Sequence, residues 1–223
     1  MTIHRCRLLM RETDTHDVQR FVFTRPDGFS YAPGQGVELA IDRDDWRDEW
    51  RPFTPTSLTE DAILQFIIKA YPSHDGVTTR LHDLAVGDTV LLRDVFGTIR
   101  YRGPGMFIAA GTGITPFVSI ARTLADSGAM ADNALLFANK THRDVVDQNE
   151  LMTLFGERCH FVLSDEDHPG YIHGTVDREL LQRHIRDIAQ YFYVCGPDGF
   201  IDSVVDSLQS LGVVRDKIVV EDA

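Results

Sequence analysis

The chain has 223 residues, of which 43% are hydrophobic and 25% charged, a balance that excludes a disordered chain. Its 34 acidic and 22 basic side chains give a net charge of −12, which argues against binding to nucleic acid. No stretch has the ~20 consecutive apolar residues that a membrane-spanning helix requires, and the charged first twenty residues lack the apolar core of a secretory signal. We therefore expect a cytoplasmic protein that is not attached to a membrane.

The first half of the chain is predicted to form a small antiparallel β-barrel. Short apolar runs, mostly alternating with polar residues, are separated here by turn sequences such as Pro26-Asp27-Gly28. These runs are Ile3–Met10, Val18–Thr24, Gly36–Ile41, Ile63–Ala70 and Thr89–Arg93. With the extended segment that begins at Arg51 we expect six strands, and one short helix near Thr78–Leu84.

The second half alternates between strands and helices, which predicts a parallel sheet covered by helices. The expected strands are Met106–Ala110, Ala134–Ala138, Cys159–Ser164, Tyr191–Cys195 and Ile218–Val220. The expected helices are Pro116–Ala125, Asn149–Phe155, Asp177–Ile185 and Gly199–Leu211. The pattern changes at the turn-rich sequence Arg102-Gly103-Pro104-Gly105. We therefore expect a β-barrel domain over residues 1–102 and a Rossmann-like α/β domain over residues 103–223.

The cysteines and histidines give no sign of a disulfide framework or a metal site. Cys6, Cys159 and Cys195 are an odd number at wide spacing, which fits a reducing compartment. Three thiols are also too few for a Cys₄ iron–sulfur cluster. The nine histidines show no ligand spacing with a cysteine or carboxylate partner, so we predict no metal. Nothing in the sequence indicates an oligomer, and we expect a monomer.

A glycine-rich turn joins the first strand of the second half to its first helix. Within Ala109–Pro116 an apolar strand runs into Gly111-Thr112-Gly113, and the helix begins at the proline. Glycine lets the backbone approach a phosphate closely, and the amides at a helix N-terminus attract its charge. The third glycine of the usual dinucleotide fingerprint is absent, and the next strand ends at Asn139-Lys140 rather than at an acidic residue. A plain strand–helix turn therefore remains the alternative.

The second informative segment is Arg51-Pro52-Phe53-Thr54-Pro55-Thr56-Ser57. Its two prolines favour an extended backbone, which displays the arginine, the aromatic ring and the hydroxyl in fixed directions. Arginine suits a phosphate, an aromatic ring suits a flat heterocycle, and a threonine hydroxyl can bond a ring nitrogen. Without further context, an ordinary proline-bearing edge strand is the simpler interpretation.

Together with two further motifs, these segments resemble the ferredoxin–NADP⁺ reductase superfamily. Arg51–Ser57 is similar to its flavin motif R-x-[YF]-[ST]-x-x-S, and Gly76–Leu81 to its second flavin-phosphate turn. Gly111–Pro116 matches its G-T-G-x-x-P nucleotide turn, and Cys195-Gly196-Pro197 matches its C-G-P motif. Val219-Val220-Glu221 resembles its terminal strand. The resemblance implies an N-terminal barrel that binds flavin and a C-terminal domain that binds NAD(P)H.

For the flavin side, the resemblance implies a role for each matching residue. Arg51 would pair with the flavin pyrophosphate, Phe53 would pack on the isoalloxazine, and Thr54 would bond near N5, the atom that accepts hydride. The expected flavin-binding set is Arg51, Pro52, Phe53, Thr54, Ile67, Lys69, Tyr71, Gly76, Val77, Thr78 and Thr79. FAD is favoured over FMN, because an arginine precedes the aromatic residue and a second phosphate turn follows.

For the nucleotide side, Thr112 and Gly113 would hold the pyrophosphate, and Cys195 would lie beside the nicotinamide. The expected nucleotide-binding set is Gly111, Thr112, Gly113, Pro116, Asn139, Lys140, Cys195, Gly196 and Pro197. With Glu221, which would lie near the contact between the two rings, Thr54 and Cys195 form the expected catalytic set. The alternative for Cys195 is a small apolar residue that ends a buried strand.

The implied reaction passes hydride from NAD(P)H to bound FAD and then single electrons to a ferredoxin, a flavodoxin or a haem protein. The stretch Asn139-Lys140-Thr141 is similar to NADH-using relatives, although Lys140 and Arg143 could pair with a 2′-phosphate, so we favour NADH over NADPH. The alternative is a flavin-binding redox sensor or electron-transfer subunit without turnover of its own.

Two segments near these motifs carry further expectations. The acidic run Asp42–Glu49, with Trp46 and Trp50, is expected to be a solvated loop, and its alternative is a loop that contacts the electron acceptor. The chain ends at Ala223, where many members of the family have an aromatic residue over the flavin. Because alanine cannot stack, we expect an open nicotinamide site.

Overall fold

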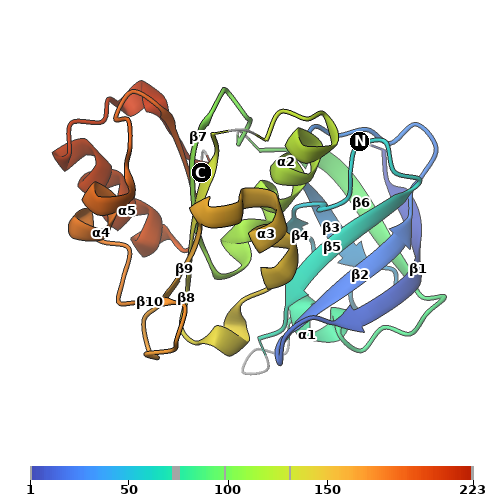
Figure 1. Ribbon diagram of the computed structural model, residues 1–223. Helices are drawn as coiled ribbons and strands as arrows, with labels where there is room; N and C mark the ends of the chain where they lie inside the picture. The colour runs from blue at the N-terminus through green and yellow to red at the C-terminus, as the bar shows by residue number, and fades with distance from the viewer. Residues whose placement is uncertain (1, 72–75, 98, 131, 222–223) are drawn as a thin grey trace.

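The computed structural model describes residues 2–71, 76–97, 99–130 and 132–221, which form two β-sheets with helices on both faces of the second (Figure 1). In the N-terminal half, the elements are β1 (His4–Thr13), β2 (Val18–Thr24), β3 (Gly36–Ile41), β4 (Arg51–Phe53), β5 (Ile63–Lys69), α1 (Val77–Leu81) and β6 (Thr89–Phe96). All of these strands pair antiparallel, in the order β4-β3-β6-β1-β2-β5.

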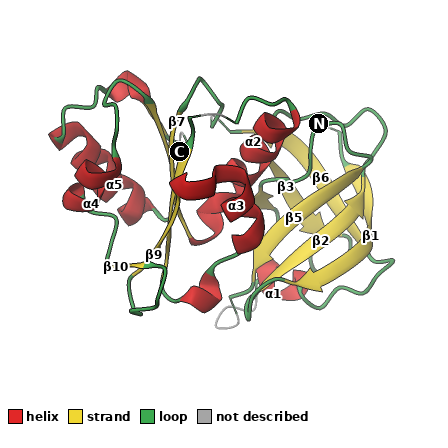
Figure 2. Ribbon diagram, in the orientation of Figure 1, coloured by secondary structure: helices red, strands yellow, loops and turns green. Residues whose placement is uncertain are grey.

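The antiparallel sheet curls into a barrel around an aromatic core (Figure 2). Alternate residues of β2 and β5 point inward, and Phe21 lies opposite Phe66 in the ladder between these strands. Both rings are fully buried. The Thr56 amide, just beyond β4, donates a hydrogen bond of 2.7 Å to the Gln65 carbonyl of β5. This bond brings the two outer strands of the sheet together.

The C-terminal sheet is parallel, with the strand order β10-β9-β8-β7-β11-β12. Its strands are β7 (Gly105–Ala110), β8 (Ala134–Asn139), β9 (Cys159–Leu163), β10 (Ile172–His173), β11 (Tyr191–Cys195) and β12 (Ile218–Val219). Its helices are α2 (Thr115–Asp126), α3 (Gln148–Phe155), α4 (Arg178–His184) and α5 (Asp198–Ser210). Short 3₁₀ turns are η1 (Gly111–Ile114), η2 (His142–Asp144), η3 (Gly156–Arg158) and η4 (Arg215–Lys217). The sequence of an antiparallel sheet followed by a parallel one confirms the predicted fold class.

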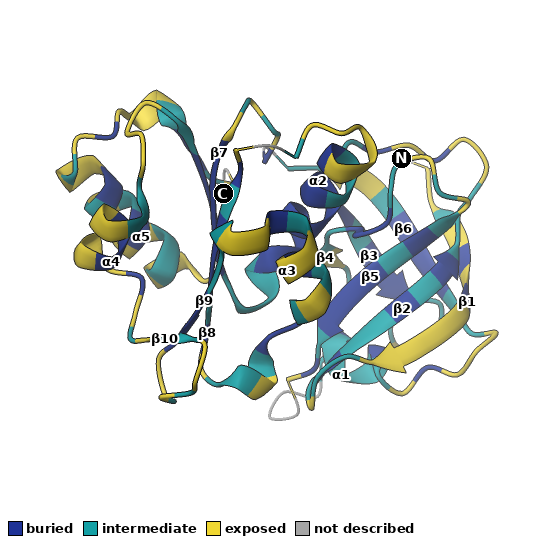
Figure 3. Ribbon diagram, viewed as in Figure 1, coloured by how far each residue is buried: buried dark blue, intermediate teal, exposed yellow. Residues whose placement is uncertain are grey.

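Helices α2 and α3 lie between the parallel sheet and the barrel, while α4 and α5 cover the opposite face of the sheet (Figures 1 and 2). Buried residues of α2 and α3 pack with Val18 and Ile67 of the barrel in one hydrophobic cluster. The central strands of the parallel sheet are buried on both faces, as Figure 3 shows. For that reason their sequences are continuous apolar runs rather than alternating ones. The two halves therefore share a hydrophobic cluster.

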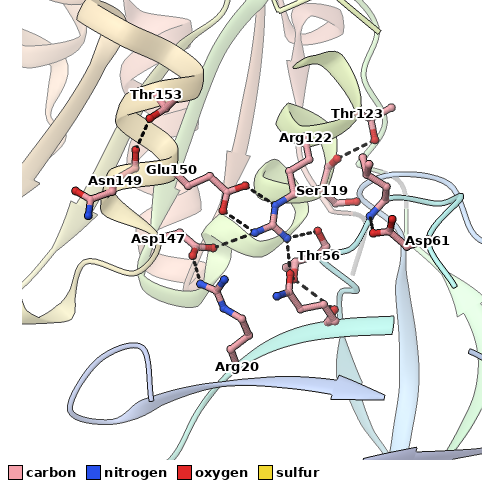
Figure 4. Close-up of polar contacts among 12 residues, drawn as sticks. Arg20, Thr56, Asp61, Ser119, Arg122, Thr123, Asp147, Asn149, Glu150 and Thr153 are labelled. Atoms are coloured by element: carbon pink, nitrogen blue, oxygen red, sulfur yellow. Dashed lines mark hydrogen bonds and ion pairs between the residues drawn. The ribbon is translucent and has the colours of Figure 1, made fainter. Parts of the chain in front are cut away.

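A polar clamp crosses this interface at Arg122 of α2 (Figure 4). Its guanidinium donates two hydrogen bonds of 2.6 Å to the two carboxylate oxygens of Glu150 on α3, and one of 2.6 Å to the Thr56 carbonyl of the barrel. Nearby, Arg20 of β2 pairs with Asp147, which is 8% exposed and has a left-handed backbone (φ +51°). We call Arg20, Arg122, Asp147 and Glu150 the interdomain clamp.

Most predicted element bounds differ from the structure by one to three residues, and two of these differences have a clear local cause. β1 continues to Thr13, because Arg11, Glu12 and Thr13 pair with β2 although their side chains are exposed. Asp177 precedes α4 as its N-cap, and its side chain accepts a hydrogen bond of 2.8 Å from the Leu180 amide. Strand β10 was not predicted. Among the described residues, no helix combines the length and the apolar character needed to cross a membrane.

Candidate functional site

A cleft of about 1110 Å³ lies between the barrel and the carboxyl ends of the parallel strands. Parallel sheets bind their ligands at this edge, where the loops that follow the strands diverge. A site for one small ligand typically measures about 300–1,000 Å³, so this cleft is larger than a typical site of that kind. β4, β5 and α1 form the barrel wall, and the segments after β7, β8, β9 and β11 form the opposite wall.

The barrel wall contains the predicted flavin motif. Phe53 and Thr54 are half-buried and line the cleft, so the Phe53 ring is not sealed in the barrel core. The Arg51 guanidinium is 49% exposed and pairs with the Glu49 carboxylate at 3.0 Å. Lys69 pairs with Asp17 at 2.7 Å. The wall thus presents an aromatic ring, a hydroxyl and two cationic groups on a short edge strand and its neighbour.

The predicted phosphate turn leads into the same cleft. Gly76 caps α1 with an extended backbone, and Gly76, Val77 and Thr78 line the cavity. The first amides of a helix have no acceptor within the helix itself, so the Val77 and Thr78 amides are available to an anion. Thr79 does not line the cleft, because its hydroxyl donates a hydrogen bond of 3.1 Å to the Tyr71 carbonyl. This bond stabilises the phosphate turn instead.

Across the cleft, the glycine turn after β7 packs directly on the end of β11. Gly111 has a left-handed backbone (φ +53°), which glycine adopts without strain. A Cβ atom at Gly113 would lie 2.5 Å from the Cys195 carbonyl oxygen, far inside van der Waals contact. Only glycine fits there, and the close approach places Gly111-Thr112-Gly113 beside Cys195-Gly196-Pro197 on one wall.

Cys195 and Glu221 lie together at the base of this wall. Burial, with a smaller effect of the Glu221 carboxylate, raises the pKa of the Cys195 thiol to about 12. Cys195 is therefore a neutral thiol near pH 7 and a poor nucleophile. Desolvation by the surrounding protein also raises the pKa of Glu221. Its carboxylate lies against Gly97, since a Cβ there would be 3.4 Å from Oε1.

Asn139 and Lys140 line the cleft at the carboxyl end of β8. Asn139 is 9% exposed, and its Nδ2 atom has no hydrogen-bond partner among the described residues. Such a buried donor is costly unless a ligand pairs with it. The phosphates and ribose of a dinucleotide accept hydrogen bonds from donors of this kind, which here are the Asn139 amide, the glycine turn and the first amides of α1. The residues present therefore fit dinucleotide cofactors.

With the exception of Thr79, every residue of the predicted site lines this cleft. Residues that sequence reasoning missed also line it: Gly36, Ile68, Phe96, Ala110, Thr115, Ala138, Asp144, Ser164, Gly174, Thr175, Val176 and Phe200. Ser164 could have been found, because it is the last residue of the predicted parallel strand Cys159–Ser164 and ligands bind at the carboxyl ends of such strands. Gly174, Thr175 and Val176 follow β10, which is two residues long and carries no periodic pattern.

Two predictions concern segments at the edges of the site. In the acidic run, Arg47 pairs with Asp42 at 2.6 Å and with Asp44 at 3.0 Å, while Trp46 packs on the barrel core. The Trp50 ring lies 4.0 Å from the Arg93 guanidinium carbon. Ala223, on which the expected open nicotinamide site depends, lies outside the described residues.

Comparisons with known proteins agree with this geometry. The family model of the oxidoreductase FAD-binding domain matches residues 5–101, and that of the oxidoreductase NAD-binding domain matches residues 107–206. NADH–cytochrome b5 reductase 1 of Arabidopsis thaliana is 28% identical over 92% of this chain and 79% of its own length.

Solved structures share the fold of the whole chain. The CS-b5R domains of human Ncb5or, in the NAD⁺ form, match with a TM-score of 0.86 and 26% identity over 98% of this chain and 69% of that one. A ferredoxin NADP⁺ reductase from Neisseria gonorrhoeae with bound FAD and NADP has a TM-score of 0.85 over 98% of this chain and 97% of that one, and its 18% identity speaks for the fold alone. The chain therefore belongs to the ferredoxin–NADP⁺ reductase superfamily and is an NAD(P)H-dependent flavoprotein reductase that binds FAD.

Proposed function

We propose that this reductase uses NADH in preference to NADPH and delivers electrons to a small haem or iron–sulfur protein. The observation that carries the proposal is the shared cleft, in which Phe53 and Thr54 of the barrel lie on one wall and Gly111–Gly113 and Cys195 on the other. Bound FAD supplies the conversion between a two-electron donor and a one-electron acceptor. The protein supplies binding, orientation and exclusion of water.

Each wall has a distinct task in this proposal. Arg51, whose exposed partner is Glu49, would pair with the flavin pyrophosphate, and the Thr54 hydroxyl would donate a hydrogen bond to the flavin ring. The Gly111–Gly113 backbone binds the nucleotide phosphates. Cys195, a neutral and nearly buried thiol, limits the depth of the nicotinamide site without taking part in proton transfer. None of these tasks requires a general base.

The preference for NADH is supported by the end of β8. The Asn139 side-chain amide, which has no partner within the described part of the chain, offers a donor to a ribose hydroxyl, and the curated relative described above is named for NADH. Lys140 lines the same edge and is the cation that a 2′-phosphate would meet. The ratio of kcat/KM for NADH to that for NADPH should exceed one. A ratio below one would reverse this part of the proposal.

The acceptor class is supported by the names of the relatives, which include a cytochrome b5 reductase and the ferredoxin–NAD(P)⁺ reductase component of a Ralstonia dioxygenase system, 26% identical over 90% of this chain. The test is NADH oxidation with purified cytochrome b5, with a ferredoxin, and with ferricyanide as an artificial acceptor. Reduction of either protein supports the proposal. Turnover with ferricyanide alone would mean that the protein is a reductase whose natural acceptor is of another class. A yellow protein that is inert toward NADH and NADPH would instead favour a redox sensor.

A further inference from the structure

We propose that His142, Glu166 and His168 bind one divalent transition-metal ion of the zinc class. The three side chains offer ligand atoms that all lie within 4.8 Å of one another. His142 Nδ1 is 2.9 Å from each carboxylate oxygen of Glu166, and the His142 and His168 ring centroids are 4.4 Å apart. The site stands outside the described cleft and does not depend on the proposed function.

The ligand set has the chemistry that zinc prefers. Two imidazoles and one carboxylate bind zinc in known proteins, with a fourth position open to water. In a tetrahedral site, the Zn–N and Zn–O lengths of about 2.0–2.2 Å place neighbouring donor atoms about 3.4 Å apart. The His142–Glu166 pair needs to open by only about 0.5 Å to reach this spacing. The His142 and Glu166 side chains are 37% and 28% exposed, so an ion can enter from solvent.

Both ligand-bearing segments are held in place by their own hydrogen bonds. Thr141 and Asp144 form a reciprocal capping box around η2, which fixes the turn that carries His142. The Ser164 amide donates to the Asn139 carbonyl at 3.0 Å, and the Asp165 amide to the Lys140 carbonyl at 2.9 Å. These bonds align the loop after β9 with the loop after β8. The two loops are therefore tied to each other directly beside His142 and Glu166.

Contacts around the ligands match the outer shell of metal sites. Ligating histidines commonly bond a carbonyl through the ring nitrogen that does not face the metal. His168 Nδ1 lies 3.2 Å from the Pro169 carbonyl oxygen, which leaves Nε2 for an ion, and Tyr171 packs edge-on against its ring at 5.1 Å. The His142 amide donates a hydrogen bond of 2.8 Å to the Glu166 carboxylate, which holds this side chain beside the histidine.

Another group of potential ligands, His16, Asp17 and Asp144, is less suitable. Lys69 already compensates the charge of Asp17 at 2.7 Å, and the Asp144 carboxylate is held in the capping box by Thr141. In contrast, Glu166 is flanked along the chain by Asp165 and Asp167, which add negative charge near the proposed ion.

The test uses untagged full-length reductase with its FAD, first treated with a chelator and then titrated with Zn²⁺ by calorimetry. We expect one equivalent of Zn²⁺ to bind. His142→Gln, Glu166→Gln and His168→Gln should each weaken binding by roughly tenfold or more, because each removes a ligand. Cobalt(II) absorbance provides a second, independent report of the ligand set.

His173→Gln is the matched control, because His173 is an exposed histidine on neighbouring β10 outside the group. It should bind Zn²⁺ like the wild type. FAD content and circular dichroism of each variant report folding, and three separate single substitutions prevent one misfolded variant from deciding the result. Absence of stoichiometric binding to the wild type, or equal affinity in folded His142→Gln/His168→Gln protein, would overturn the proposal.

Discussion

Replacing Arg122 with methionine should weaken the attachment of the two halves to each other. Arg122 is 15% exposed and loses four hydrogen bonds, two to Glu150, one to the Thr56 carbonyl and one to the Gln65 side chain. Removing one partner of a buried ion pair costs about 3–5 kcal/mol, because the other charge stays uncompensated. Glu150 is 34% exposed and can be partly hydrated, so we expect a cost below this range, about 2–3 kcal/mol.

For a chain of this size, that loss corresponds to a fall in Tm of about 4–12 °C. Calorimetry of wild type, Arg122→Met, Glu150→Gln and the double variant would measure the coupling between the two side chains. The second substitution should cost little once the first is present. A Tm within about 1 °C of wild type for Arg122→Met, or additive effects in the double variant, would refute this account of the clamp.

The clamp also has a predicted pH dependence. The hydrogen bonds from Arg122 lower the pKa of Glu150 below its ordinary value of 4.5. A group with a lowered pKa in the folded state stabilises the protein fully above its ordinary pKa, and this stabilisation is lost as the pH falls through the lowered value. The difference in unfolding free energy between wild type and Arg122→Met should therefore be constant near pH 7 and shrink below about pH 4.5. A difference that grows on acidification would contradict this assignment.

Three further substitutions or treatments test the walls of the cleft. Gly113→Ala should lower the free energy of unfolding by about 1–3 kcal/mol and weaken NADH binding, because its Cβ would meet the Cys195 carbonyl oxygen at 2.5 Å. Calorimetry measures the first effect and a binding titration the second. Arg51→Gln should weaken FAD binding roughly ten- to a hundredfold through loss of a charge-assisted bond, as fluorescence titration of the apoprotein would detect, whereas Arg43→Gln on the exposed loop should not. Cys6 and Cys195 are buried, and burial raises the pKa of both thiols to about 12, so a thiol reagent at pH 8 should modify these two only after denaturation; their rapid modification in the native protein would contradict their burial.

Much of the fold could be predicted from local patterns. The strands Gly36–Ile41 and Tyr191–Cys195 have the predicted bounds, because turn residues delimit their apolar runs. β10 could not be predicted, since a two-residue strand at the edge of a sheet has no period. The position of the division between the domains, placed at residue 102, stays a prediction.

The part of the site that short motifs form could be predicted from the sequence. Short motifs fix backbone shape, and Gly111–Gly113 and Arg51–Thr54 reach the cleft through their own turns and strands. Contacts between distant segments leave no such trace. Arg20 and Asp147 are 127 positions apart, and the sequence around either residue does not indicate that the two form a pair. The grouping of His142 with Glu166 and His168 was missed in the same way, because it joins the loops after two different strands.

The most direct test of the central claim is anaerobic stopped-flow mixing of the FAD-loaded protein with NADH and, separately, with NADPH, while the absorbance of the bound flavin is followed. The account predicts that NADH bleaches the flavin in a phase whose rate saturates with nucleotide concentration, and that added one-electron acceptor restores the colour. A flavin that stays oxidised with both nucleotides would contradict the claim that the two walls of the cleft bring donor and flavin together.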